Sequence, residues 1–219
     1  MPPDVFLQRL RDITRQHGML LVCDEVQCGM GRTGKMFAVQ HTGVEPDVVT
    51  MAKGIASGMP LGVVLSRADV MSWTPGMHAS TFGGNPVSCA AALATIRLLR
   101  DRLIANAAEV GAHMMAAAKA LMDKHPIVGD VRGRGLMIGI ELVRDRTTRE
   151  RATSERDAVV RECFTRGLLV LGAGMNAIRV SPPLVLTKQQ ADTAVQIIDE
   201  ALTAVTTKNT KNTKGRSGA

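Results

Sequence analysis

The stretch MLLVCDEVQCGMGRTG (19–34) decides the fold. Its first residues, MLLVC, are apolar, as in a short strand that is buried on both faces. Asp24 ends this strand, and a glycine-rich loop follows. A second short run, DVVTMA (47–52), ends in the same way at Lys53. Two such runs indicate neighbouring strands of a sheet that carries polar side chains at the carboxyl ends of its strands, where open α/β sheets place their chemistry.

Helical and extended segments alternate along the rest of the chain. The patterns predict helices over 4–17, 85–99, 106–124, 154–166 and 188–204, and further strands over 61–66, 136–142, 168–173 and 178–182. Asp4 is expected to cap the first helix, and Asn85 with Pro86 to start the second. The segment VRGRG (131–135) is expected to be a turn. This alternation indicates an α/β fold.

Composition and charge narrow the functional classes. The 219 residues are 45% hydrophobic and 21% charged, as in an ordinary globular protein, and no apolar run approaches the roughly 20 residues of a membrane span. Aromatic residues make up only 2%, which argues against a base-stacking nucleic-acid module. The net charge is +7, but much of it lies in the acid-free segment 206–219. This segment is therefore expected to be a polar, disordered tail and not a binding face.

Cysteine and histidine usage bears on the compartment and on metal binding. The four cysteines form no C-x-x-C pair, which fits reduced thiols in the cytoplasm. The N-terminal segment carries Asp4 and Asp12 where a signal peptide would need an apolar run. The five histidines show no metal-ligand spacing, so no metal is expected.

Asp24 and Lys53 are the first candidates for chemistry. A lysine that follows a buried strand is either a side chain reaching for solvent or an amine that bonds to an aldehyde cofactor. Asp24 either caps the turn after its strand or holds a proton on a pyridine nitrogen. The residue types alone leave both alternatives open at each position.

Four motifs in order resemble the class III, pyridoxal-phosphate-dependent aminotransferases. They are DEVQCGMGRTGKMFA (24–38), EPDVVTMAKGIASGMPLG (45–62), STFGGNP (80–86) and IRVSPPL (178–184). The resemblance implies the fold-type I architecture of transferases that use this cofactor. It implies part of the large domain, with a mixed and mostly parallel sheet, over 1–105, and a small α+β domain over 106–205.

The resemblance also assigns roles to four residues near the two strand ends. Lys53 matches the lysine that bonds to pyridoxal phosphate and moves a proton during the reaction. Asp24 matches the partner of the ring nitrogen. Val26 matches the residue that packs on one face of the ring, and Gln27 matches the polar neighbour of its phenolic oxygen.

Two further matches lie elsewhere in the chain. Thr81 matches a threonine that reaches the phosphate of the cofactor in the other subunit of a homodimer; the plain alternative is a turn threonine. Arg179 matches the arginine that binds a substrate carboxylate in a bidentate manner, and the alternative is an exposed arginine at a strand edge. The resemblance thus implies a homodimer or larger homo-oligomer.

The implied function is transfer of an amino group from an amino acid or omega-amine to a 2-oxo acid. Within the family, the motifs look most similar to 4-aminobutyrate and acetylornithine enzymes. Two alternatives remain: an amino-acid racemase of the same family, and a non-catalytic fragment that binds a full-length paralogue. Nucleic-acid binding through the basic tail is disfavoured because the tail is short and lacks aromatic residues.

Members of the family are about twice as long, and the phosphate-binding loop and the aromatic that stacks on the ring are expected to precede residue 1. We therefore expect the isolated chain to bind the cofactor weakly and to show little or no transaminase activity. Steady-state assay of the purified chain with amino donors and 2-oxo acids checks this expectation, and normal turnover would contradict it.

Overall fold

The computed structural model describes residues 1–214, and the chain forms two compact units that divide between Ala107 and Ala108. The boundary expected from the sequence lies two residues earlier, between 105 and 106. We call the two parts the N-terminal unit and the C-terminal unit and describe each by itself.

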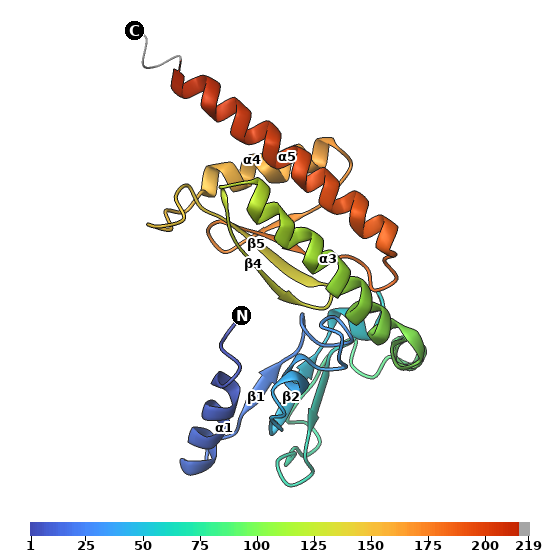
Figure 1. Ribbon diagram of the computed structural model, residues 1–219. Coiled ribbons are helices and arrows are strands. Elements are labelled where there is room, and N and C mark those ends of the chain that lie inside the picture. Colours follow the sequence, from blue (N-terminus) through green and yellow to red (C-terminus); the bar gives the residue numbers. More distant parts are fainter. Residues whose placement is uncertain (215–219) are drawn as a thin grey trace. The chain divides into compact units, whose positions relative to one another are not determined.

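The N-terminal unit is built on a short mixed sheet. Its elements are α1 (Phe6–Gln16), β1 (Val22–Asp24), the 3₁₀-helix η1 (Ala38–His41), β2 (Val48–Met51), the 3₁₀-helix η2 (Lys53–Ala56), β3 (Val63–Ser66) and α2 (Pro86–Leu98). The strand order is β1-β2-β3, and β1 and β2 lie side by side in Figure 1. β1 pairs with β2 in parallel and β3 pairs with β2 in antiparallel orientation. The sheet is mixed as expected, although only one of its two pairings is parallel.

The first strand starts later than the sequence predicts. β1 begins at Val22, not at residue 19, because the backbone N–H of Leu21 donates to Asp47 Oδ2 at 2.7 Å before the chain enters the sheet. The predicted burial on both faces is wrong for this strand, since Val22 is 54% exposed. Met19 and Leu20 are exposed as well.

The predicted cap is present at the start of α2 and absent at the start of α1. Asn85 Oδ1 accepts from the backbone N–H groups of Val87 and Ser88, which confirms the predicted start of α2. The predicted Asp4 cap is wrong, because α1 follows Val5 and has no side-chain cap. A break was expected between the second and third helices, but the π-helical turn η3 (Leu99–Leu103) joins α2 directly to α3 (Ile104–Lys124).

The C-terminal unit contains an antiparallel sheet. After α3 its elements are β4 (Val128–Arg134), β5 (Met137–Leu142), α4 (Thr153–Thr165), β6 (Leu171–Ala173), β7 (Ala177–Val180) and α5 (Lys188–Lys214). The strand order is β4-β5-β7-β6, with antiparallel neighbours throughout. Helix α4 packs against this sheet, and α5 packs in turn on α4. Ile138 and Ile140 of β5 and Ile178 of β7 are fully buried and form the centre of the core.

Two predictions for this unit are wrong. Arg132 and Arg134 lie in strand β4 and not in a turn; the chain turns only at Gly135 and Leu136, because β4 pairs with β5 as far as Arg134. The helix expected to end near 204 continues to Lys214, so its last residues extend into the segment expected to be a polar tail. Val205 is buried, and Thr206 Oγ1 donates to the carbonyl of Leu202 one turn back. Residues 215–219 lie outside the described residues.

Among the helices in the described part of the chain, none has both the length and the apolar character that a bilayer crossing demands.

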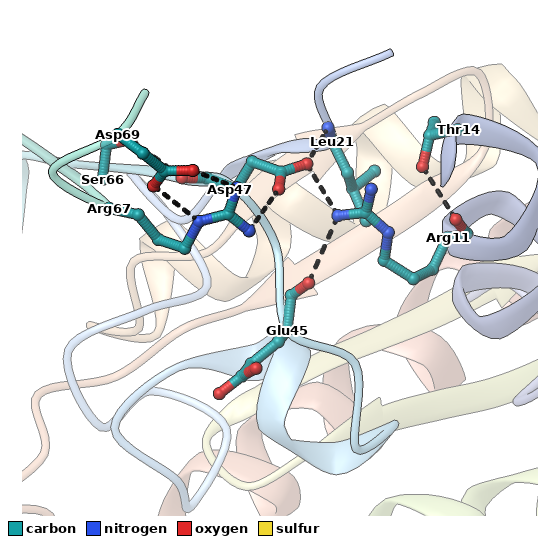
Figure 2. A network of polar contacts seen from close by, with 8 residues as sticks. All are labelled: Arg11, Thr14, Leu21, Glu45, Asp47, Ser66, Arg67 and Asp69. Atoms are coloured by element: carbon teal, nitrogen blue, oxygen red, sulfur yellow. Dashed lines mark hydrogen bonds and ion pairs between the residues drawn. The ribbon is translucent and has the colours of Figure 1, made fainter. Parts of the chain in front are cut away.

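Asp47 connects the elements of the N-terminal unit (Figure 2). It lies directly before β2, and its Oδ2 accepts from Arg11 of α1 and from the backbone of Leu21, each at 2.7 Å. Its Oδ1 accepts from Arg67 at 3.1 Å, and its carbonyl accepts from Ser66 Oγ at 2.9 Å. Asp47 and Arg11 are both buried. One carboxylate therefore ties α1, the entry to β1 and the end of β3 to the start of β2.

We predict that Asp47→Asn destabilises the N-terminal unit by about 3 kcal/mol at pH 7, because it leaves the buried Arg11 guanidinium without its counter-charge. Hydrogen bonds from Leu21 and Arg11 hold the pKa of Asp47 below its ordinary value of 3.8. The wild-type contribution is therefore present above that value and is lost as the pH falls through the folded-state pKa, whereas the variant lacks this pH dependence.

Urea unfolding at pH 7 and pH 3 measures this effect, followed by fluorescence of Trp73, the single tryptophan of the chain, which lies in the same unit. Asp69→Asn is the matched control, because Asp69 is exposed and pairs with Arg67 at the surface. An unchanged midpoint for Asp47→Asn, or an equal loss for Asp69→Asn, would contradict the prediction.

Candidate functional site

The carboxyl ends of the parallel strands β1 and β2 bring Asp24 next to Thr50. The two residues are paired in the sheet register, and the backbone N–H of Glu25 donates to the carbonyl of Thr50 at 2.9 Å. Asp24 Oδ1 accepts from the backbone N–H of Val26 at 2.9 Å, and Thr50 Oγ1 lies 3.5 Å from the same oxygen. Asp24 is exposed, so its carboxylate is held at the sheet edge and remains accessible.

Lys53 follows β2 after a single residue and has a strained backbone. It is the first residue of η2, it is exposed, and its φ of 46° lies in the left-handed region. For a residue other than glycine, this backbone conformation raises the energy by about 1–3 kcal/mol. It persists only where the surrounding structure enforces it. The buried Ile55 and Ala56 anchor η2, and Ser57 Oγ lies 3.0 Å from Thr95 Oγ1 of α2. The reading of Lys53 as an ordinary surface lysine offers no reason for this strain.

Val26 and Gln27 lie in the turn that follows Asp24, with Val26 half-buried and Gln27 exposed. The turn is closed by Glu25, which the sequence analysis did not single out. Glu25 is only 3% exposed, and its carboxylate accepts from the backbone N–H groups of Ala38 and Val39. The signal that could have revealed it is an acidic residue placed between the apolar strand and the apolar Val26.

Thr81 lies in an exposed turn before α2. The backbone N–H of Gly83 donates to the carbonyl of Ser80 at 3.2 Å and closes this turn, and Gly84 adopts a φ of 71° before Asn85 caps the helix. A pocket in the same unit is lined by both sides of this turn and by β2 and β3, through Ser80, Gly83, Thr50 and Val63 among others. Thr81 itself is not among the residues that line it.

Arg179 is the one candidate in the C-terminal unit; the other five lie in the N-terminal unit. It occupies β7, paired with Gly139 of β5 on one side and Leu171 of β6 on the other. It is half-buried and lines a groove whose other walls are largely apolar, including Leu168, Leu171, Val180 and Pro183. A guanidinium in an apolar groove suits a ligand that has one carboxylate and an apolar body.

The side chains at the sheet edge fit the ring portion of pyridoxal phosphate. An amine (Lys53), a carboxylate (Asp24) and an amide (Gln27) match, in turn, an aldehyde, a ring nitrogen and a phenolic oxygen. Within residues 1–214, no group of three or more His, Cys, Asp or Glu side chains is arranged to hold a metal ion.

Comparison with known proteins identifies the family to which the chain is similar. A model of the aminotransferase class-III family matches residues 1–202. The acetylornithine aminotransferase of Mycobacterium tuberculosis is 45% identical over 212 residues, which cover 93% of this chain and 50% of that protein. The leucine/methionine racemase of Thermococcus litoralis is 41% identical over 94% of this chain and 47% of its own length.

Among solved structures, the chain is similar to transaminases. An amine transaminase from an uncultivated Pseudomonas species, determined in its pyridoxal-phosphate-bound form, superposes with a TM-score of 0.87 at 38% identity. The match covers 94% of this chain and 49% of that one. The chain spans about half the length of the curated relatives it matches.

Proposed function

Because this chain belongs to the class-III aminotransferase family, whose cofactor is pyridoxal phosphate, we propose that it supplies half of a transaminase active site. The reaction moves an amino group from an amine or amino acid to a 2-oxo acid. The observation that carries the proposal is the strained Lys53 just beyond the end of β2, beside the parallel strand that ends in Asp24. The N-terminal unit then corresponds to part of the cofactor-binding domain and the C-terminal unit to the small domain.

Each residue has a distinct task in this proposal. Bound pyridoxal phosphate supplies the electron sink that stabilises negative charge on the substrate carbon. Lys53 Nζ would hold the cofactor at its aldehyde carbon and would carry the proton to or from the reacting carbon of the substrate. Asp24 keeps the ring nitrogen protonated, because a carboxylate beside it favours the charged form. Val26, which is half-buried, would pack on the ring, and the exposed amide of Gln27 would donate a hydrogen bond to its phenolic oxygen.

Thr81 and Arg179 extend the proposal beyond this sheet edge. Thr81 binds the phosphate of the cofactor in a second copy, so the active form is a homodimer or larger homo-oligomer. Arg179 binds the substrate carboxylate, and the apolar groove beside it accommodates a short aliphatic chain such as that of 4-aminobutyrate. The four cysteines are free thiols, which fits a reducing, cytoplasmic compartment.

Two alternatives make different predictions for the products. Racemisation uses the same lysine, and two of the similar curated proteins are racemases, of leucine/methionine and of alanine/serine. A racemase inverts the α-carbon of its substrate without forming an oxo product, whereas a transaminase converts alanine or leucine to a 2-oxo acid and 4-aminobutyrate to an aldehyde. A non-catalytic fragment that binds a full-length paralogue does neither. Single-turnover incubation of excess chain and pyridoxal phosphate with alanine and leucine, analysed by chiral chromatography, and with 4-aminobutyrate, analysed for the aldehyde, distinguishes a racemase from a transaminase even at low activity. Capture of a full-length paralogue without any product marks the non-catalytic fragment.

We predict that pyridoxal phosphate gives the chain a visible absorption band and that borohydride then fixes the cofactor covalently on Lys53. Lys53→Ala is expected to lack both, because Lys53 is the lysine that follows the end of β2, whereas Lys35 of the same unit donates to the carbonyl of Gln40. Absorption spectra and mass spectrometry of the reduced, digested chain measure the label.

Lys35→Ala is the matched control: Lys35 is also exposed in the N-terminal unit, but its Nζ donates to the carbonyl of Gln40. Its spectrum should equal that of the wild type. A label that persists in Lys53→Ala, or that maps to Lys35, would overturn the role of Lys53.

A further inference from the structure

The carboxylate of Glu25 closes the loop between β1 and η1 from both ends. Its Oε1 accepts from the backbone N–H of Val39 at 2.8 Å. Its Oε2 accepts from the N–H of Ala38 and from the thiol of Cys28, both at 3.0 Å. Burying a carboxylate is costly unless its oxygens are hydrogen-bonded, and here three donors from the loop meet that requirement. The buried side chain of Glu25 thus bonds to residues that lie 13 and 14 positions after it in the sequence.

The turn inside this loop is tight and leaves no room for a side chain at Gly29. The backbone N–H of Gly29 donates to the carbonyl of Glu25 at 2.9 Å. A Cβ on Gly29 would lie 2.8 Å from that carbonyl oxygen and 3.0 Å from Glu25 Cβ. Val26 and Gln27 are the residues between these fixed ends, and Val26 is also bonded to Asp24 Oδ1.

We propose that Glu25 is the positioning residue of this site: its carboxylate fixes the loop that holds Val26 and Gln27 beside Asp24. The expected effect on bound pyridoxal phosphate rests on the proposed function. The fixing of Val26 and Gln27 by the Glu25 carboxylate does not, because it follows from the hydrogen bonds within the loop. Asp24 and Lys53 are held separately, by the β1–β2 pairing and by η2. Loss of the Glu25 carboxylate should therefore loosen the contacts to the ring and leave the attachment to Lys53 intact.

Cys28 offers a graded way to weaken the same contacts. Burial, together with the hydrogen bond to Glu25, raises the pKa of Cys28 to about 12, so the thiol stays protonated and donates at neutral pH. Cys28→Ala removes this one donor and keeps the two backbone donors. Cys28→Ser keeps a donor at the same place and should restore the wild-type behaviour.

The first experiment measures amide hydrogen exchange without cofactor. Glu25→Gln has one acceptor oxygen and an NH₂ group, so it cannot accept from both sides as the carboxylate does. We expect exchange at Val26, Gln27, Ala38 and Val39 to accelerate at least about tenfold, with a smaller acceleration in Cys28→Ala and none in Cys28→Ser. Protection of β2 should be unchanged. Glu45→Gln makes the same change at an exposed glutamate of this unit. It should alter neither the exchange at these four amides nor the protection of β2.

Unchanged exchange in Glu25→Gln would overturn the proposal. So would an equal loss of protection in β2, because Glu25 would then serve only the stability of the whole unit.

The second experiment adds pyridoxal phosphate and borohydride. Glu25→Gln should still be labelled on Lys53, but the maximum of the visible band, or the pH at which that band titrates, should shift from the wild-type value. A spectrum and pH profile identical to wild type would overturn the positioning role at the cofactor. If the wild-type chain itself gives no label on Lys53, the proposed function fails, and the exchange experiment alone decides whether Glu25 fixes Val26 and Gln27.

Discussion

The buried carboxylate of Asp47 is the interaction on which the N-terminal unit depends. Three short strands of three or four residues each cannot bury enough surface to define their own positions. Asp47 supplies the missing constraint, because the side chain of Arg11 and the backbone of Leu21 reach the same oxygen from different elements. This contact lies at the start of both strands and helps to hold β1 in its register with β2, which places Asp24 opposite Thr50.

The site is therefore built in two stages, from different kinds of interaction. Charged hydrogen bonds at the amino end of β2 set the strands, while backbone pairing at the other end places Asp24 beside Thr50. The loop that carries Val26 and Gln27 is added through the buried carboxylate of Glu25. The buried carboxylates of Asp47 and Glu25 thus stabilise the strands and the loop. The exposed carboxylate of Asp24 remains accessible to a ligand.

What the sequence could predict was local. A polar residue that ends an apolar run indicated the positions of Asp24 and Lys53, and the Asn85 cap needs only the next three residues. The partners of Asp47 and Glu25 lie far away in the chain, so no short pattern contains them. Strand β4 was missed because its glycines are typical of a turn. In the structure Gly133 is needed for another reason: a Cβ there would lie 2.2 Å from the carbonyl oxygen of Met137 on the paired strand. The assignment of residue roles came from the family resemblance and not from periodicity.

The left-handed backbone at Lys53 has a consequence for how this chain can evolve. Glycine adopts that conformation without steric cost, so replacing the lysine by glycine would relieve strain while removing the amine. Under the proposed function, stability favours glycine at this position and chemistry requires the lysine. In a lineage in which the chain served only as a packing partner, mutation would be free to exchange the lysine for glycine or asparagine. Retention of lysine here is expected only where selection acts on the amine itself.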